Sequence, residues 1–222
     1  MGSKDAERAR ALVRERINVA RAAMDTCDED IARELEALMA RGIAPTCRKG
    51  CAHCCRQEIL LPRAEAEAIV EWMQASWPPA QIEALKDRLR TWLAWYRDEF
   101  KRRVGSGEDR QVVAYEHGPF CVALQDGACS IYPVRPMTCR IHYVSSSPDA
   151  CRQARDPRYA GDEKMAVLSS IHRVSQPAIL RIRAVIERQG ADFLATVHLL
   201  PEWLAHLLRV EDQPWRTAPP LF

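Results

Sequence analysis

The distribution of cysteines constrains this chain more than any other feature of its sequence. Seven of the nine cysteines fall into two clusters, and about 65 residues of unrelated sequence separate them. Cysteine loops this far apart in the sequence can act together if a single centre binds thiolates from both. A metal ion or an iron–sulfur cluster is the natural candidate for such a centre. The clustered residues are Cys47, Cys51, Cys54 and Cys55 in the first group and Cys121, Cys129 and Cys139 in the second.

A disulfide scaffold is the alternative use of so many cysteines. The N-terminal segment Met1-Gly2-Ser3-Lys4-Asp5 is polar, and the apolar core of a signal peptide does not follow it. No run approaches the roughly 18 apolar residues of a membrane span, so we expect a cytoplasmic protein that makes no membrane contact. Thiols stay reduced in that compartment, and an odd number of cysteines cannot all pair. Metal or redox chemistry is therefore favoured.

The charge balance argues against a nucleic-acid-binding surface. The formal net charge is only +2, and residues 1–41 carry eight Lys or Arg against nine Asp or Glu. Nucleic-acid binding requires basic residues that acidic neighbours do not offset. We therefore expect an unknown protein or small molecule as partner and no nucleic acid.

The hydrophobic pattern is mostly that of helices. Apolar residues recur at three- and four-residue steps over 5–41, where a capping-box pattern at Thr26-Cys27-Asp28-Glu29 leaves open a break near Asp25. A second helical block follows Pro62, and the clearest stripe runs from Ile82 to Phe100.

The hydrophobic pattern is less uniformly helical in the later part of the chain. Apolar runs on both sides of Gln125-Asp126-Gly127 predict a β-hairpin. Helical patterns return at 161–175, 178–189 and 191–210, and Pro201 should kink or restart the last of these. The predicted fold class is mainly α, a helical scaffold with a small β-hairpin and irregular cysteine-rich loops that form a metal site.

A single domain over 1–222 accommodates these elements, because 47% hydrophobic residues is enough for a sizeable core. We expect a helical N-terminal segment at 5–42, a cysteine-cluster core at 44–142 and C-terminal helices at 161–210.

The residues around the cysteines favour metal binding. Short spacings let thiolates converge, and Gly50 permits the sharp backbone that such a loop needs. Cys27 lies on the apolar stripe of its helix and Cys151 stands apart, so we expect Cys27 to pack in the core and Cys151 to be a bystander rather than a ligand. The side chains of the adjacent Cys54 and Cys55 are expected to diverge. Basic residues that would offset clustered thiolates are Arg48, Lys49, Arg56, Arg135 and Arg140.

Histidines and arginines near the cysteines have two interpretations each. His53, His117 and His142 are candidate ligands or acid–base groups, although a hydrogen-bonded loop imidazole is the commoner role. Arg135 and Arg140 could hold a substrate carboxylate or phosphate, or could pair structurally. No catalytic residue stands out.

The cysteine pattern and its neighbours resemble a known family. The spacing Cys47-x3-Cys51-x2-Cys54-Cys55, followed by Phe120-Cys121 and by Cys129-Ser130-Ile131-Tyr132-Pro133 through Arg135-Pro136 to Cys139-Arg140, is similar to the YkgJ-type cysteine cluster proteins. These are bacterial proteins described as carrying a zinc- or iron-chelating CxxCxxCC domain. The resemblance covers about 44–142 and implies metal binding more than an activity. The chain departs from the pattern at Ile141-His142-Tyr143.

The identity of the metal stays open between two candidates. Four sulfurs suffice for one Zn2+ or one [4Fe–4S] cluster, and seven are present. The Cys-x3-Cys-x2-Cys triplet also occurs in radical S-adenosylmethionine enzymes, but this chain lacks the repeated strands of their barrel. A related pattern in bacterial flagellin lysine methylases is associated with an iron–sulfur cluster. We favour [4Fe–4S], with Zn2+ as the alternative.

Three functions remain compatible with the sequence. The first is an iron–sulfur protein with a role in redox chemistry or in cluster-dependent modification of another molecule. The second is a zinc-stabilised structural or interaction module without catalysis. The third is an enzyme related to the flagellin methylases, so the sequence leaves open whether the protein is an enzyme.

Overall fold

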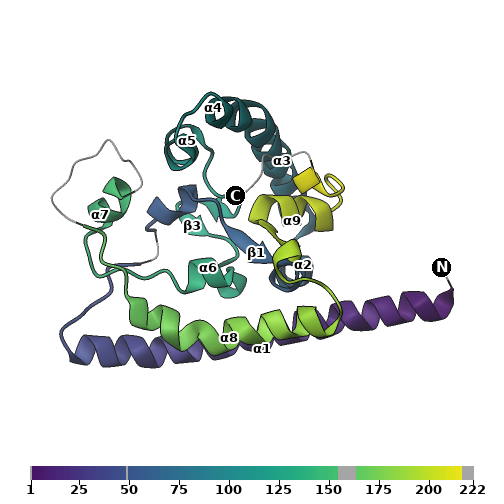
Figure 1. Ribbon diagram of the computed structural model, residues 1–222, viewed down its shortest axis with the longest axis horizontal. Coiled ribbons are helices and arrows are strands. Elements are labelled where there is room, and N and C mark those ends of the chain that lie inside the picture. Colours follow the sequence, from purple (N-terminus) through teal and green to yellow (C-terminus); the bar gives the residue numbers. More distant parts are fainter. Residues whose placement is uncertain (1, 49, 155–163, 217–222) are drawn as a thin grey trace.

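A computed structural model of the chain describes residues 2–48, 50–154 and 164–216. Its base is a pair of long antiparallel helices that lie side by side, α1 (Ser3–Ala40) and α8 (Ser169–Arg188) (Figure 1). The first turns of α1 extend beyond the rest of the molecule (Figure 1). Small residues such as Ala20 and Ala23 are fully buried in this layer, so the two backbones approach closely.

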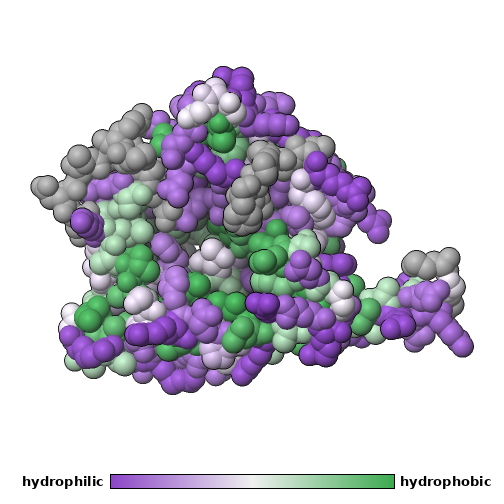
Figure 2. Space-filling model, in the orientation of Figure 1, coloured by the Kyte–Doolittle hydropathy of each residue, from purple (hydrophilic) through white to green (hydrophobic). Residues whose placement is uncertain are grey.

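The other helices stand on one side of this pair and enclose a second core. Helix α2 contacts both layers, and its face toward α1 buries the small residues Ala64 and Ala68. Trp92, Tyr96 and Phe100 form a continuous stack in the second core, with ring centroids 4.7 and 4.6 Å apart. Hydrophilic side chains dominate the exposed surface over α3–α5 (Figure 2). The helices are α2 (Arg63–Ser76), α3 (Pro79–Trp95), the π-helical turn η2 (Tyr96–Phe100), α4 (Lys101–Gly105), α5 (Arg110–His117) and α9 (Leu200–Leu207).

Short strands connect distant parts of the chain. Strand β1 (Leu60–Pro62) pairs antiparallel with β4 (Val197–Leu199), with Leu60 opposite Leu199. This pairing joins the segment after the first cysteine cluster to the C-terminal helix α9. Strands β2 (Leu124–Gln125) and β3 (Ala128–Cys129) form a hairpin.

Several short helical turns complete the cysteine-containing region and the C-terminal part. The single bridge Val144–Val167 links the segments that precede α7 and α8. The turns are η1 (His53–Arg56), η3 (Tyr132–Val134), α6 (Met137–Arg140), α7 (Pro148–Gln153), η4 (Leu194–Thr196) and η5 (Pro214–Arg216).

The structure confirms the predicted fold class, and the hairpin turns at Asp126 and Gly127, whose φ angles are 49° and 73°. The first helix is unbroken at Asp25. The predicted helix over 191–210 was wrong in its first half, where Leu194–Thr196 form a 3-10 turn and Val197–Leu199 form strand β4. Pro201 lies in the first turn of α9, which begins at Leu200.

Other predictions about the C-terminal half were wrong. No helix occupies 164–168, and 161–163 lie outside the described residues. Helix α8 passes through Pro177 without ending there, because buried residues before and after the proline, such as Ile171 and Ile182, pack on α1. Helix α5 and the β1–β4 pairing were not predicted.

None of the helices in the described part of the chain has the length and apolar content that crossing a bilayer requires.

Candidate metal centre

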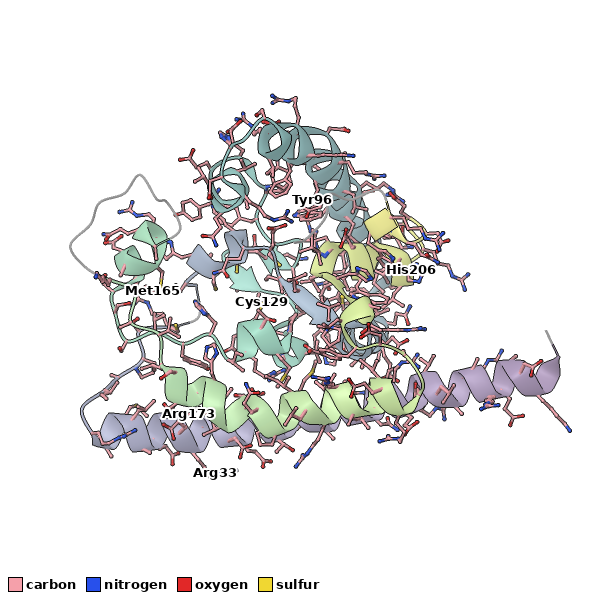
Figure 3. The ribbon with its side chains drawn as sticks, viewed as in Figure 1. Arg33, Tyr96, Cys129, Met165, Arg173 and His206 are labelled. Carbon is pink, nitrogen blue, oxygen red and sulfur yellow. The ribbon has the colours of Figure 1, made fainter. Side chains whose placement is uncertain are left out.

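All seven clustered cysteines line one cavity of about 160 Å³. Cys47 and Cys51 lie in the loop before η1, Cys54 and Cys55 in η1, Cys121 before the hairpin, Cys129 in β3 and Cys139 in α6. In the view of Figure 3, half-buried Cys129 lies between the α1–α8 pair and the helices above it. The structure therefore brings together all seven cysteines that the sequence analysis selected as metal ligands.

Backbone hydrogen bonds fix the first cysteine loop against the second half of the chain. The Cys121 amide donates to the Cys55 carbonyl oxygen at 2.7 Å, which joins the two clusters directly. The Thr46 amide donates to the Val144 carbonyl oxygen at 2.9 Å. Within the loop, Gly50 has a φ of 89°, a conformation that side chains with a Cβ rarely adopt. These contacts position the first group of thiols.

The second cluster is held by its own set of contacts. The Ser130 amide and hydroxyl both donate to the Ala123 carbonyl oxygen at 2.8 Å, which closes the hairpin that carries Cys129. Helix α6 begins where the Met137 amide donates to Glu65 Oε2 at 2.7 Å, a carboxylate from α2. The Thr138 hydroxyl donates to the Leu60 carbonyl oxygen at 2.9 Å. Cys139 is therefore placed by contacts with α2 and β1.

Arg140 has a structural role in this arrangement. Its side chain is fully buried, and its guanidinium pairs with Asp28 of α1 and donates to the Pro133 carbonyl oxygen at 2.9 Å. Of the two interpretations of Arg140, the structure shows structural pairing. Arg135 instead lines the cavity, with its guanidinium 3.9 Å from the centre of the Tyr132 ring.

Five of the cavity thiols have raised pKa values, which disfavours their ionisation. Burial raises the pKa of Cys121 to about 12 and raises that of Cys139 well above its ordinary value. The pKa of Cys55 is raised by a hydrogen bond with Cys54 and then by burial. Burial also raises the pKa values of Cys47 and Cys129. A bound cation would reverse this balance, so metal binding at this site must release protons.

The adjacent cysteines differ from our expectation. Cys54 and Cys55 both line the cavity and share a side-chain hydrogen bond, so the prediction that they diverge was wrong. Both lie in the tight 3-10 turn η1, which differs from the extended backbone that sends successive side chains to opposite sides.

The donor set fits a soft metal centre. Among the described residues, the side chains of the cysteine, histidine and carboxylate types that line the cavity are the seven cysteines and His142. Thiolates of this kind select zinc and iron–sulfur clusters over hard cations. Within the described residues, no three such side chains already converge as a closed metal site. Ligation therefore requires the thiols to turn within the cavity that they share.

The remaining sequence candidates lie elsewhere. Cys27 is fully buried between α1 and α8, as predicted, and Cys151 is buried in α7 outside the cavity. His53 lines a neighbouring cleft, and His117 lies at the end of α5, outside both spaces. None of the nine cysteines forms a disulfide.

Sequence reasoning missed the residues that support the site. Glu65 and Asp28 hold α6 from two other helices, and Tyr132 and Tyr143 line the cavity. Glu65 and Asp28 carry no sequence signal for this role, because both resemble ordinary polar positions of a helix. The two tyrosines could have been noticed from their places beside Cys129 and Cys139.

Comparison with known proteins gives one result. Residues 46–158, half of the chain, match the model of the CxxCxxCC family, which is described as a "Putative zinc- or iron-chelating domain". No curated protein and no solved structure matches the chain significantly. The matched segment contains all seven cysteines that line the cavity. The chain therefore belongs to the CxxCxxCC family of zinc- or iron-chelating domains.

Proposed function

We propose that the protein binds an iron–sulfur cluster of the [4Fe–4S] type through cysteines of both clusters, and that it acts in redox chemistry or in a cluster-dependent modification. One observation carries this proposal: seven thiols from distant parts of the chain line a single cavity. The ligands would come from Cys47, Cys51, Cys54, Cys55, Cys121, Cys129 and Cys139. When bound, such a cluster supplies one-electron transfer at a potential that its surroundings set.

The protein contributes an environment suited to this chemistry. Ile59, Ala123, Ile131 and Leu200 form apolar parts of the cavity wall, which limits water access to the thiols. The guanidinium of Arg135 lies at the same wall and offsets part of the charge of clustered thiolates. These residues hold and shield the ligands. The hydrogen bond from the Cys121 amide to the Cys55 carbonyl oxygen holds the two cysteine clusters next to each other.

A zinc-binding structural or interaction module is the second candidate. The observation that favours it is the position of the cavity, which joins the loop after α1 to the hairpin and α6. Four thiolates bound to one Zn2+ would cross-link these segments, and the site would then have a structural role and no catalytic one. The family description includes both metals.

Elemental analysis of protein purified without oxygen separates the two candidates. The proposal predicts a coloured protein with about four iron and four sulfide per chain, as a [4Fe–4S] cluster requires. Colourless protein with about one tightly bound zinc per chain contradicts the iron–sulfur assignment and supports the zinc module.

Paired substitutions test whether the two clusters share a centre. Cys47→Ser and Cys129→Ser each remove one thiol from a different part of the chain, and both should lower the metal content. Cys27→Ala is the matched control, since this cysteine is buried outside the cavity, and it should retain full metal content. Because four of the seven thiols suffice, the other five cysteines are also replaced by serine in turn. Loss of metal confined to variants of one cluster would contradict a centre shared by both clusters.

A further inference from the structure

A second and larger cleft lies beside the cysteine cavity. It has a volume of about 430 Å³, within the range of small-molecule sites. Its wall includes Arg48, His53, Arg56, Tyr115 and Phe120. Cys51 lines both this cleft and the cysteine cavity, so a molecule in the cleft would lie against the proposed metal centre.

The charge of this cleft is one-sided. Two guanidinium groups and an imidazole line it, and among the described residues no carboxylate does. Within the described part of the chain, neither Arg48 nor Arg56 forms an ion pair, whereas Arg16, Arg97 and Arg110 each pair closely with a glutamate. Several arginines of this protein are therefore paired with carboxylates, whereas the two in the cleft have no carboxylate partner within the described residues.

The cleft also positions one of its cations in advance. Arg56 Nη1 donates to the Tyr115 carbonyl oxygen at 2.8 Å, and its guanidinium lies 4.0 Å from the centre of the Phe120 ring. A guanidinium held by stacking loses less freedom when it binds an oxyanion. Phe120 is still 43% exposed, so part of its ring remains available to an apolar group.

We propose that this cleft binds a small organic anion, a carboxylate or phosphate attached to an apolar body. Arg48 and Arg56 would hold the oxyanion, because arginine donors match carboxylate and phosphate oxygens. Phe120 and Tyr115 would contact the apolar part. The binding itself does not depend on the metal, but the place of the ligand next to the metal centre rests on the function proposed above.

Calorimetry with phenyl phosphate tests this inference, with inorganic phosphate and phenol as partial probes. Phenyl phosphate should bind at least tenfold more tightly than either part alone, because only the complete probe meets both the cations and the aromatic wall. Arg48→Gln should weaken its binding about tenfold. This variant loses no hydrogen bond or ion pair that the structure shows within the described residues, and Phe120→Leu provides a second, uncharged test that should also weaken binding.

Arg14→Gln is the matched control, since it removes the same charge from an exposed position of α1. It should bind phenyl phosphate as the unmodified protein does. Absence of binding heat, equal affinity for inorganic phosphate, or equal losses in Arg48→Gln and Arg14→Gln would each overturn the inference. Iron, sulfide and zinc are measured on the same samples, so failure of the metal proposal is recognised separately from failure of anion binding.

Discussion

Glu202 shows how a single buried carboxyl contributes to the packing of the C-terminal helix. It is only 1% exposed, and its Oε2 accepts from the Leu199 amide at 3.0 Å, which caps the start of α9. Leu199 belongs to β4, so the contact also fixes the strand that pairs with β1. Desolvation dominates over this hydrogen bond and raises the pKa of Glu202 from 4.5 to about 7.

This shift predicts a pH dependence of stability. Below pH 4.5 the carboxyl is protonated in both the folded and the unfolded chain, so its contribution is fully present. As the pH rises from 4.5 to about 7, the unfolded chain ionises first, and the free energy of unfolding falls by about 3 kcal/mol or less. Above pH 7 this contribution is lost.

Urea unfolding of the unmodified protein and of Glu202→Gln between pH 4.5 and 8 measures this effect. The amide retains an acceptor for Leu199 but cannot ionise, so the variant should gain stability relative to the unmodified protein as the pH rises. Glu65 has a pKa raised to about 7 by burial as well, but it is present in both proteins and cancels in the difference. A difference in stability that stays constant with pH would contradict the prediction.

At the scale of elements, a buried ion pair joins the two layers. Arg16 of α1 donates from Nε and Nη2 to the two carboxylate oxygens of Glu67 in α2, at 2.7 and 2.6 Å. Arg16 Nη1 also donates to Gln189 Oε1 at 2.6 Å, just after α8. One guanidinium therefore connects three helices.

Removal of one partner should be costly because the other charge stays buried. We expect Glu67→Ala to lower the free energy of unfolding by about 3–5 kcal/mol. Glu71→Ala is the matched control on the same helix, since Glu71 pairs with Arg21 of α1 at an exposed position, where such pairs contribute about 1 kcal/mol or less. Chemical denaturation of both variants measures the difference in their free energies of unfolding. Equal decreases in the two variants would show that the buried Arg16–Glu67 pair contributes no more to stability than the exposed pair.

Elements also differ in how far the sequence predicts them. The amphipathic stripes of α1 and α3 repeat over many residues, so the period of their apolar residues is enough to identify both helices. Strands β1 and β4 are three residues each and lie far apart in the chain, so no local pattern reports their pairing. Helix α8 continues through Pro177 because its contacts with α1 outweigh the local cost, a balance that periodicity alone does not reveal.

At the scale of the whole molecule, the cysteine cavity was more predictable from sequence than the contacts that support it. Thiol chemistry belongs to the residue itself, so spacing alone selected the seven cysteines that line the cavity. Their surroundings depend on tertiary contacts, such as those of Glu65 and Asp28 with α6. The cleft around Arg56 depends on such contacts too, because Phe120 and Tyr115 reach it from distant segments.

Metal removal should weaken the entire fold, since the cavity thiols come from segments on both sides of α2–α5. We expect a chelator of iron and zinc to lower the midpoint of thermal unfolding and to broaden the transition. Circular dichroism at 222 nm, read with and without chelator on anaerobic protein, measures the shift. An unchanged midpoint after complete loss of metal would show that the cysteine segments hold together by their hydrogen bonds alone.

The β1–β4 pairing has a consequence for biosynthesis. Strand β1 follows directly after the first cysteines, yet its partner strand lies far beyond Cys139 in the chain. During translation, all seven cavity cysteines are synthesised before β4, the strand that pairs with β1 next to the first cysteine loop. The nascent pocket is therefore unbraced until β4 has been translated and has left the ribosome. We expect insertion of the proposed metal centre into the braced pocket to occur only after that point.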